Sequence, residues 1–368
     1  MNKTSILVDS LLERIESGRY PAGQAVPSER QFVEEFGLSR TTVRRAIDDL
    51  VQRGRLERHP GRGTFVADAA GGPKLSSGMQ RQSVAVIIPT FANPYYGEMI
   101  DGIEKEARLS ELRLAVGQSD YSADSESLQL IQSASDPAVC GALVVPGSVD
   151  RASQGVLQFL RSGKPLVYIG RWPNGVACDG VCIDYRVAAR QAVAHLTELG
   201  HERIAYVEGL PRLPGFSPYD GYSDVMRDRR LSIDPRLVRR YDVPSELAGR
   251  SAVEDLVRER VRFTAVFARN DVTAMGVLQG LRLAGLRVPL DVSVVSIANN
   301  LWSRSLDPPL TSVDSHPSSV GQVAMRLLTD RLHGRYGGPP VRAMLEPDLI
   351  VRSSTHAAVD NVDGTTSR

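Results

Sequence analysis

Residues 36–47 read FGLSRTTVRRAI, and this stretch predicts a tight turn followed by a helix with two chemically different sides. Gly37 can end a preceding helix, and the Ser39 hydroxyl can cap a new helix over residues 40–53. At helical spacing, one side of that helix is apolar and contains Val43, Ile47 and Leu50. The opposite side is polar and basic and contains Arg40, Thr41 and Arg44. The stretch therefore predicts a helix that packs on one side and presents arginines on the other.

The residues around this stretch predict a small domain over residues 1–67. A first helix carries apolar residues at helical spacing up to Gly18, and a second one opens at PSER (27–30). Two β-prone segments, 56–58 and 64–66, surround the turn HPGRG (59–63). Two helices joined at a glycine turn and followed by a hairpin are typical of a winged helix-turn-helix.

The charge of this domain favours nucleic-acid binding. Between residues 39 and 63 there are seven arginines against three acidic residues, and no lysine. Arginine suits two-point contact with phosphate and with the major-groove edge of guanine. A solvated arginine-rich helix that serves only solubility is the alternative, but the accompanying helix, turn and glycine-rich wing favour DNA binding.

These stretches closely resemble the GntR family of bacterial regulators. The matching segments are PSER (27–30), FGLSRTTVRRAI (36–47), GRL (54–56) and GRGTFV (61–66). The resemblance implies that the domain binds DNA through the start of the helix over 40–53 and through the wing. Carried over by position, the implied DNA contacts are Arg30, Arg40, Thr41, Thr42, Arg44, Arg45, Gly61 and Arg62.

Beyond this domain the sequence pattern changes twice. Residues 68–81 (DAAGGPKLSSGMQR) are small and polar, which predicts a linker. From 82 to 352, short apolar runs such as 84–88 and 204–207 alternate with helical stretches such as 186–199. This alternation predicts an α/β fold with parallel sheets, and the length favours two lobes. The polar tail over 353–368 is expected to be disordered.

The segment over 82–352 resembles the effector domain of LacI-type regulators, which is similar to a type I periplasmic binding protein. The matching segments include IP and NPYY (88–96), LGHERIA (199–205), FARND (267–271), VPLDVSVV (288–295) and PPLTSV (308–313). The resemblance implies two lobes with a ligand cleft between them, with chain crossings near 184 and again near 300–335. A GntR-type domain joined to a LacI-type effector domain is the arrangement that arabinose repressors have.

Ligands of open α/β sheets bind at the carboxyl ends of strands, so the loops after the predicted strands supply the candidate site. The expected ligand-binding residues are Asn93, Tyr95, Tyr96, Arg171, Asp184, Asn270, Asp271 and Asn299. Aromatic rings and hydrogen-bonding groups together suit a sugar. Each residue also has a structural alternative, because Asn93-Pro94 fits a turn and Asp271 fits a helix cap.

Three positions depart from the LacI-type pattern. Gly170 stands where relatives often have Asp, Pro218 where they often have Arg, and Ala298-Asn299 where they often have two Asp residues. Two carboxylates and a guanidinium that grip ligands in relatives are therefore absent. A sugar or sugar derivative is the expected effector, but its identity does not follow from the resemblance.

The bulk composition fits a cytoplasmic regulator. The net charge is +1, the N-terminus lacks a signal-peptide pattern, and no apolar run is long enough to span a membrane. Cys140, Cys178 and Cys182 form neither a disulfide pattern nor a zinc motif, and we expect no metal, cofactor or catalytic residues. The expected function is a homodimeric repressor that leaves a near-palindromic operator when it binds its effector. An activator, a non-regulatory solute-binding protein and an enzyme are the alternatives.

Overall fold

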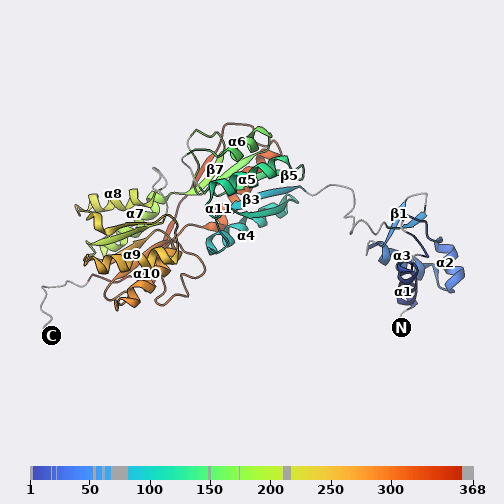
Figure 1. Ribbon diagram of the computed structural model, residues 1–368, viewed down its shortest axis with the longest axis horizontal. Coiled ribbons are helices and arrows are strands. Elements are labelled where there is room, and N and C mark those ends of the chain that lie inside the picture. The colour runs from blue at the N-terminus through green and yellow to red at the C-terminus, as the bar shows by residue number, and fades with distance from the viewer. Residues whose placement is uncertain are drawn as a thin grey trace. The chain divides into compact units, whose positions relative to one another are not determined.

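The computed structural model describes residues 3–17, 19–21, 23–52, 55–59, 63–67, 82–147, 151–173, 175–209 and 217–358. The chain divides into two compact units, Met1–Gln80 and Arg81–Arg368, which are considered separately (Figure 1). The predicted linker over 68–81 lies outside the described residues, as does the part of the tail from 359 onwards. No helix among the described residues has both the length and the apolar character needed to cross a membrane.

The first unit is a winged helix-turn-helix, as its sequence predicts. Its elements are α1 (Lys3–Glu16), α2 (Glu29–Phe36), α3 (Arg40–Gln52), β1 (Leu56–His59) and β2 (Gly63–Val66). Gly37 ends α2 in the left-handed conformation (φ 62°), and the Ser39 hydroxyl accepts a hydrogen bond from the Thr42 N–H. β1 and β2 pair antiparallel as the wing. The core of the unit contains Leu7, Leu11, Phe32, Val43, Ile47, Leu50 and Leu56, all fully buried.

One arginine ties the wing to both helices of the helix-turn-helix. Arg58 of β1 lies 3.1 Å from Glu29 of α2 and 2.8 Å from Asp48 of α3, measured between guanidinium nitrogen and carboxylate oxygen. These ion pairs are partly exposed, so each contributes little stability. They nevertheless fix the direction of the wing relative to α3, and they remove Arg58 from the set of unpaired arginines.

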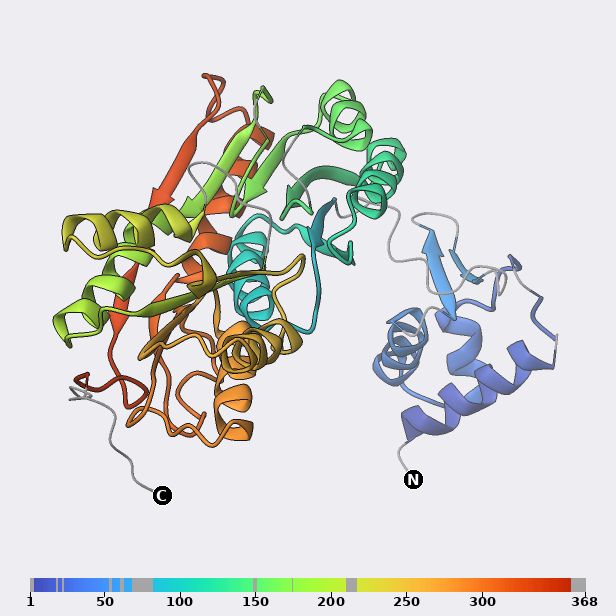
Figure 2. The same ribbon diagram turned by 60° about the vertical axis from the view of Figure 1, so that its left-hand side comes forward.

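The second unit contains two six-stranded sheets, each with helices on both faces (Figures 1 and 2). Lobe 1 has the strand order β13-β7-β6-β5-β3-β4, and every neighbouring pair in it is parallel. Lobe 2 has the order β14-β12-β11-β10-β8-β9, with only β14 antiparallel to its neighbour. The strands and helices of the unit are β3 (Ser83–Ile88), α4 (Pro94–Leu109), β4 (Arg113–Gln118), α5 (Ala123–Ser135), β5 (Val139–Val144), α6 (Gln154–Arg161), β6 (Leu166–Ile169), β7 (Asp179–Ile183), α7 (Tyr185–Glu198), β8 (Ile204–Glu208), α8 (Pro218–Asp228), the 3-10 turn η1 (Pro235–Leu237), β9 (Val238–Arg240), α9 (Glu246–Arg258), β10 (Ala265–Ala268), α10 (Asp271–Leu283), β11 (Ser293–Ala298), β12 (Thr311–Asp314), α11 (Pro317–Leu332), β13 (Arg342–Leu345) and β14 (Asp348–Ile350).

Alternate residues of the central strands fill different layers of the core. In β3, Val84 and Val86 belong to the core that α4 and α11 cover, whereas Ala85 and Ile87 belong to the core that α5 and α6 cover. In lobe 2, α7 and α8 cover one face of the sheet, and α9 and α10 cover the other. A strand that is buried on both faces must be apolar at every position, which explains the continuous apolar runs in the sequence.

The chain crosses between the lobes at three places. It passes from β7 to α7 at Asp184, from β12 to α11 at residues 315–316, and from β13 to β14 at residues 346–347. The resemblance implied crossings near 184 and in 300–335, but not the third one. The His316 Nε2 atom lies 3.0 Å from an Asp348 carboxylate oxygen, so the second and third crossings are linked by a side-chain contact.

The start of the C-terminal tail is ordered, which corrects the expectation of disorder from residue 353. Ser354 is fully buried, its hydroxyl donates to the Val294 carbonyl, and its carbonyl accepts from the Val294 N–H. The Ala358 N–H donates to the Leu199 carbonyl. A polar segment can be ordered in this way when the ends of buried strands offer it backbone partners.

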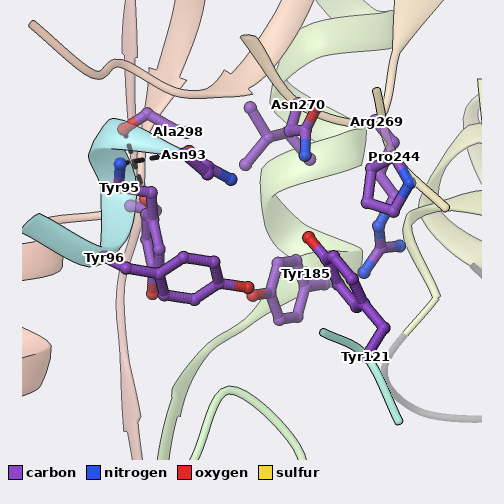
Figure 3. A pocket seen from close by; sticks show the side chains of 11 residues that line it. Asn93, Tyr95, Tyr96, Tyr121, Tyr185, Pro244, Arg269, Asn270 and Ala298 are labelled. Carbon is purple, nitrogen blue, oxygen red and sulfur yellow. Dashed lines mark hydrogen bonds between the residues drawn. The ribbon is translucent and has the colours of Figure 1, made fainter. Parts of the chain in front are cut away.

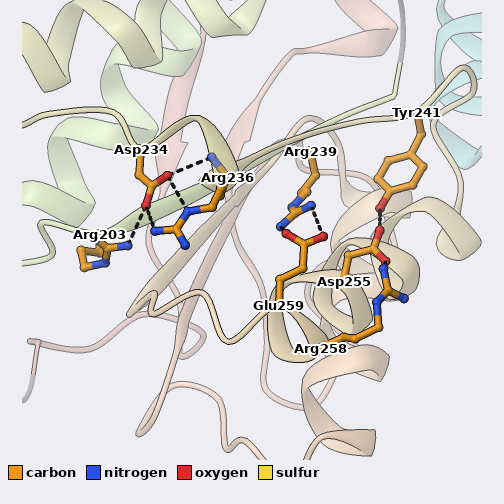
Figure 4. Close-up of polar contacts among 8 residues, drawn as sticks. All are labelled: Arg203, Asp234, Arg236, Arg239, Tyr241, Asp255, Arg258 and Glu259. Atoms are coloured by element: carbon orange, nitrogen blue, oxygen red, sulfur yellow. Dashed lines mark hydrogen bonds and ion pairs between the residues drawn. The ribbon is translucent and has the colours of Figure 1, made fainter.

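Charged side chains surround the outer edge of the lobe 2 sheet, where β9 is the last strand (Figure 4). Asp234 binds Arg203 and Arg236, and Arg239 of β9 pairs with Glu259. Hydrogen bonds from Arg236 and Arg203 hold the pKa of the half-buried Asp234 carboxyl well below its usual value. A strongly charged edge discourages pairing with strands of other molecules, so we regard this cluster as protection of the sheet edge.

Candidate functional site

A pocket lies at the carboxyl ends of the strands of both lobes (Figure 3). It contains about 520 Å³ of empty space, part of which is open to solvent. The lining residues are Asn93, Tyr95, Tyr96, Tyr121, Tyr185, Pro244, Arg269, Asn270, Ile297, Ala298 and Ser315. Nearly all of them belong to segments that directly follow a strand or end one, which is where ligands of parallel α/β sheets bind.

Four tyrosines give the pocket its aromatic surface. Tyr95 and Tyr96 meet edge to face, with ring centroids 5.3 Å apart, and Tyr121 and Tyr185 lie opposite them (Figure 3). Burial raises the pKa of the Tyr95, Tyr96 and Tyr185 hydroxyls, so these groups stay protonated and can both donate and accept hydrogen bonds. A surface of rings with hydroxyl groups suits a ligand that has an apolar face and a polar rim.

Two asparagines contribute amide groups to the pocket while they cap helices. The Asn93 side chain accepts a hydrogen bond from the Tyr95 N–H at the start of α4, and Asn270 accepts one from the Thr273 N–H at the start of α10. Each cap uses the amide oxygen, so the amide NH₂ is the group that each residue can offer to a ligand. The cap also fixes the side-chain direction, which favours a preformed site.

Four of the eight expected ligand-binding residues line the pocket: Asn93, Tyr95, Tyr96 and Asn270. The other four lie outside the lining and have protein partners. Asp184 caps α7 by accepting from the Val187 N–H, and Asn299 bonds to Asp314 and Arg352. Arg171 is buried and donates to the carbonyls of Pro146 and Gly147.

Asp271 is the clearest structural residue of these four. Its buried carboxylate accepts hydrogen bonds from three hydroxyls, those of Ser296, Ser303 and Ser312, and from the Asn300 N–H. The distances are 2.5 to 2.7 Å. Burial raises its pKa, whereas the hydroxyl donors act in the opposite direction. Asp271 therefore holds the loop after β11 against the start of α10, beside the pocket.

Several lining residues were absent from the sequence-based set. Tyr185 directly follows the expected Asp184 and begins α7, and Tyr121 follows the edge strand β4, which the sequence did not predict. Arg269 directly precedes the expected Asn270 and is the first residue after β10 (Ala265–Ala268), so its position at a strand end could have identified it. Pro244, Ile297 and Ser315 carried no chemical signal in the sequence, and Ala298 was noted only as a departure from the LacI-type pattern.

Arg269 is a charged member of the lining, and a buried ion pair holds it. Its Nη1 atom lies 3.0 Å from Oε1 of Glu208, and the Ser217 hydroxyl donates to the other carboxylate oxygen of Glu208. The Glu208 side chain is 1% exposed and that of Arg269 is 12% exposed. The guanidinium also lies 5.7 Å from the centre of the Tyr185 ring. The charge of Arg269 is thus fixed in place at the pocket wall.

The α3 helix of the first unit presents its arginines to solvent. Arg40, Arg44 and Arg45 are exposed, and within the described residues none of them forms an ion pair. Arg30 of α2 is also exposed and lies 3.1 Å from Glu34 of the same helix. Thr41 is exposed, and Thr42 contacts the Ser39 hydroxyl. Gly61 and Arg62 lie outside the described residues.

Known proteins resemble this chain in sequence and in structure. It is 30% identical to the HTH-type transcriptional repressor CytR of Escherichia coli over 280 residues, which cover 76% of this chain and 80% of CytR. It is 25% identical to the arabinose metabolism transcriptional repressor of Geobacillus stearothermophilus over 95% of this chain and 96% of that protein. The solved complex of the regulator CelR with cellobiose matches with a TM-score of 0.68 at 28% identity, and covers 86% of this chain and 91% of CelR.

Two domain families match the two units. Residues 3–66 match the gntR family of bacterial regulatory proteins, and residues 193–355 match the periplasmic binding protein-like domain. A winged helix-turn-helix joined to a two-lobed, pocket-bearing domain defines a DNA-binding transcription regulator. The chain belongs to the family of such regulators that carry a LacI-type effector domain, and its DNA-binding domain is of the GntR type.

Proposed function

We propose that this regulator represses genes of carbohydrate use and leaves its operator when a sugar-like effector binds between its lobes. The proposal rests on one observation: a pocket with four tyrosines and two amides occurs in the same chain as α3, whose three exposed arginines form no ion pair with any described residue. The similarity to an arabinose metabolism repressor along 95% of the chain supports the same combination of roles. Both DNA and the products of sugar uptake occur in the cytoplasm, where we expect the protein to act.

In this proposal α3 enters the major groove with its N-terminal end. Arg40, Thr41, Thr42 and Arg44 lie in the first turns of that helix, where the side chains of a recognition helix meet base edges. Arg30 and Arg45 would bind phosphates, and Gly61 and Arg62 would let the wing approach the backbone. Two heads of a homodimer would contact half-sites about 34 Å apart or a multiple of this, on a near-palindromic operator.

The effector half of the proposal rests on the lining of the pocket. A sugar ring could stack on a tyrosine while the amides of Asn93 and Asn270 bind its hydroxyls. The Leu301 N–H of lobe 2 donates to the Glu98 carboxylate of lobe 1 at 2.9 Å, so the two lobes already share a hydrogen bond. An effector that binds more tightly to the closed lobes would weaken operator binding. The coupling free energy between two such sites is usually about 1–3 kcal/mol.

A selection from random DNA tests the proposal. The full-length protein is used to enrich binding sequences, and fluorescence anisotropy then measures its affinity for the enriched site with and without a panel of sugars. We expect a two-part, near-palindromic site and a sugar that weakens binding several-fold. Failure to enrich any sequence would contradict the DNA-binding role, and tighter binding with a sugar would indicate activation or co-repression instead of release.

A further inference from the structure

The charges at the pocket are unequal, and this inequality indicates what kind of sugar derivative would fit. Among the described residues that line the pocket, Arg269 is the single ionised side chain, and no Asp or Glu belongs to the lining. The remaining polar groups are neutral phenols, amides and one hydroxyl. A ligand in this pocket therefore meets one formal charge, and that charge is positive.

A second buried guanidinium adds to the positive field. Arg171 is not part of the lining but interacts electrostatically with its tyrosines, and its side chain donates hydrogen bonds to the neutral carbonyls of Pro146 and Gly147. Burial and the positive charge of Arg269 both lower the pKa of Arg171, which indicates that the two guanidiniums repel each other. Arginine nevertheless keeps its proton in proteins, so two positive charges persist near the pocket.

The nearby carboxylates compensate only part of this charge. Glu208 pairs with Arg269 but does not belong to the pocket lining, and its side chain is 1% exposed. Glu126 accepts from the Gly147 N–H, but burial raises its pKa to about 7, so it is only partly ionised at neutral pH. Arg269 therefore has one carboxylate partner, Glu208, whereas within the described residues no ion pair links Arg171 to a carboxylate.

The geometry of Arg269 leaves donors for a ligand. A guanidinium carries N–H groups on three nitrogens, and the pairing with Glu208 uses Nη1. Figure 3 shows the guanidinium pointing from the loop after β10 toward Tyr121 and Tyr185. A planar guanidinium with one edge fixed by a carboxylate can offer another edge to a second anion, the pairing that arginine makes best.

We propose that the effector is a sugar derivative with an anionic group, a carboxylate or a phosphate, which binds to Arg269 in the field of Arg171. This inference rests on the proposed sugar-sensing function and narrows its ligand class. A neutral sugar would cover Arg269 and remove water from it without supplying a charge, and such desolvation is costly. An anionic sugar would supply a charged acceptor for the N–H groups of Arg269 that Glu208 does not use, and the tyrosines and amides would bind its ring.

Matched sets of ligands test the proposal with the full-length protein. Isothermal titration calorimetry compares glucose with glucuronate, with the uncharged amide of glucuronate and with glucose 6-phosphate, and repeats the comparison for galactose and ribose derivatives. We expect an anionic member to bind at least tenfold more tightly than its neutral counterpart. The uncharged amide has nearly the size of the acid, so it separates charge from shape, and the acid and phosphate arms show which anion the pocket prefers.

Variants then assign the effect to Arg269. For the best anionic ligand, Arg269→Gln should weaken binding about 10- to 100-fold, the scale of a lost hydrogen bond to a charged group. Arg269→Lys retains a charge opposite Glu208 and should fold even where the Gln variant does not, with an intermediate loss. Arg282→Gln, an exposed arginine on α10 of the same lobe, is the matched control and should bind like the wild type.

The outcomes distinguish the proposal of an anionic effector from the proposal that the protein senses a sugar. Neutral sugars that bind as tightly as their anionic counterparts would overturn the anionic effector but leave sugar sensing intact. Unchanged binding of the anionic ligand to a folded Arg269 variant would overturn it as well. If no member of any set binds, both the anionic effector and the proposed sugar effector fall, while operator binding is judged separately by the DNA selection.

Discussion

The guanidinium of Arg269 and the carboxylate of Glu208 form an ion pair that is nearly sealed from solvent, with 3.0 Å between Nη1 and Oε1. The pair follows from strand register. β10 and β8 are parallel neighbours in which Ala268 lies opposite Val207. The next residues of the two strands, Arg269 and Glu208, therefore lie side by side where the strands end. Sheet pairing thus places a charged group at the pocket wall and its counter-ion next to it.

Removing Glu208 should destabilise the second unit strongly. Glu208→Ala leaves the guanidinium of Arg269 buried without its counter-ion, and breaking such a pair costs about 3–5 kcal/mol. The two tryptophans, Trp172 and Trp302, both belong to the second unit, so tryptophan fluorescence during urea unfolding of the full chain reports on this unit alone.

A matched control for this variant exists at the edge of the same sheet. Glu259→Ala removes the partner of Arg239 from the more exposed cluster in Figure 4 and should cost no more than about 1 kcal/mol. Equal losses for the two variants would show that burial of the Arg269 pair carries no special energetic weight.

Alanine substitutions on α3 should weaken DNA binding without unfolding the domain. Arg40→Ala or Arg44→Ala removes an exposed guanidinium, and each should cost about 1–3 kcal/mol of specific binding. Fluorescence anisotropy on the selected operator measures the loss, and a titration with salt shows how many phosphate contacts disappear. Arg282→Ala in the second unit is the control, and full affinity in both α3 variants would refute the recognition-helix assignment.

The sequence predicted the elements that are buried and regular. The helix expected over 40–53 is α3 (Arg40–Gln52), and the strand expected over 204–207 is β8 (Ile204–Glu208). Edge strands escaped prediction because half of their residues face solvent and interrupt the apolar run. β4 (Arg113–Gln118) is an example, and the pocket residue Tyr121 was missed together with it.

The pocket was harder to predict because a polar residue after a strand can either line the pocket or form buried hydrogen bonds within the protein. Asn270 and Asp271 are adjacent and follow the same strand, yet Asn270 lines the pocket and Asp271 is buried beneath it. Its hydroxyl donors come from residues 296, 303 and 312, which only the folded chain brings together. The sequence does not show that these residues converge, so both Asn270 and Asp271 were predicted as ligand contacts, with a helix cap as the alternative for Asp271.

These two neighbours should therefore give opposite phenotypes. Asp271→Ala leaves several buried donors without an acceptor, and each unsatisfied donor costs about 1–3 kcal/mol. The substitution should therefore lower the stability of the second unit by several kcal/mol. Asn270→Ala removes one helix cap, at a cost of about 1 kcal/mol, but also removes an amide that lines the pocket and is proposed to bind the ligand. Urea unfolding and calorimetry with the best-binding panel sugar measure both properties. A stable Asp271→Ala protein that no longer binds the sugar would mean that Asp271 contacts the ligand after all.

The buried carboxyl of Glu126 should make stability depend on pH near neutrality. Burial raises its pKa in the folded protein from 4.5 to about 7, so between these values the folded state keeps a proton that the unfolded chain has lost. Stability then falls as the pH rises from about 4.5 to 7, because the unfolded state binds fewer protons. Above pH 7 both states are ionised and the loss is complete, at an order of about 3 kcal/mol.

Glu126→Gln should remove this loss, since the amide oxygen can still accept the Gly147 N–H and carries no charge. We expect the unfolding free energy of the variant, relative to the wild type, to rise between pH 5 and 7 and to level off by pH 8. Glu104→Gln, which removes a more exposed carboxylate paired with Arg108 in the same lobe, should show at most a small change. A difference between Glu126→Gln and the wild type that stays constant from pH 5 to 8 would mean that Glu126 ionises at an ordinary pKa. The positive charge of Arg171 would then be compensated at neutral pH, and an anionic effector would lose part of its electrostatic advantage in this pocket.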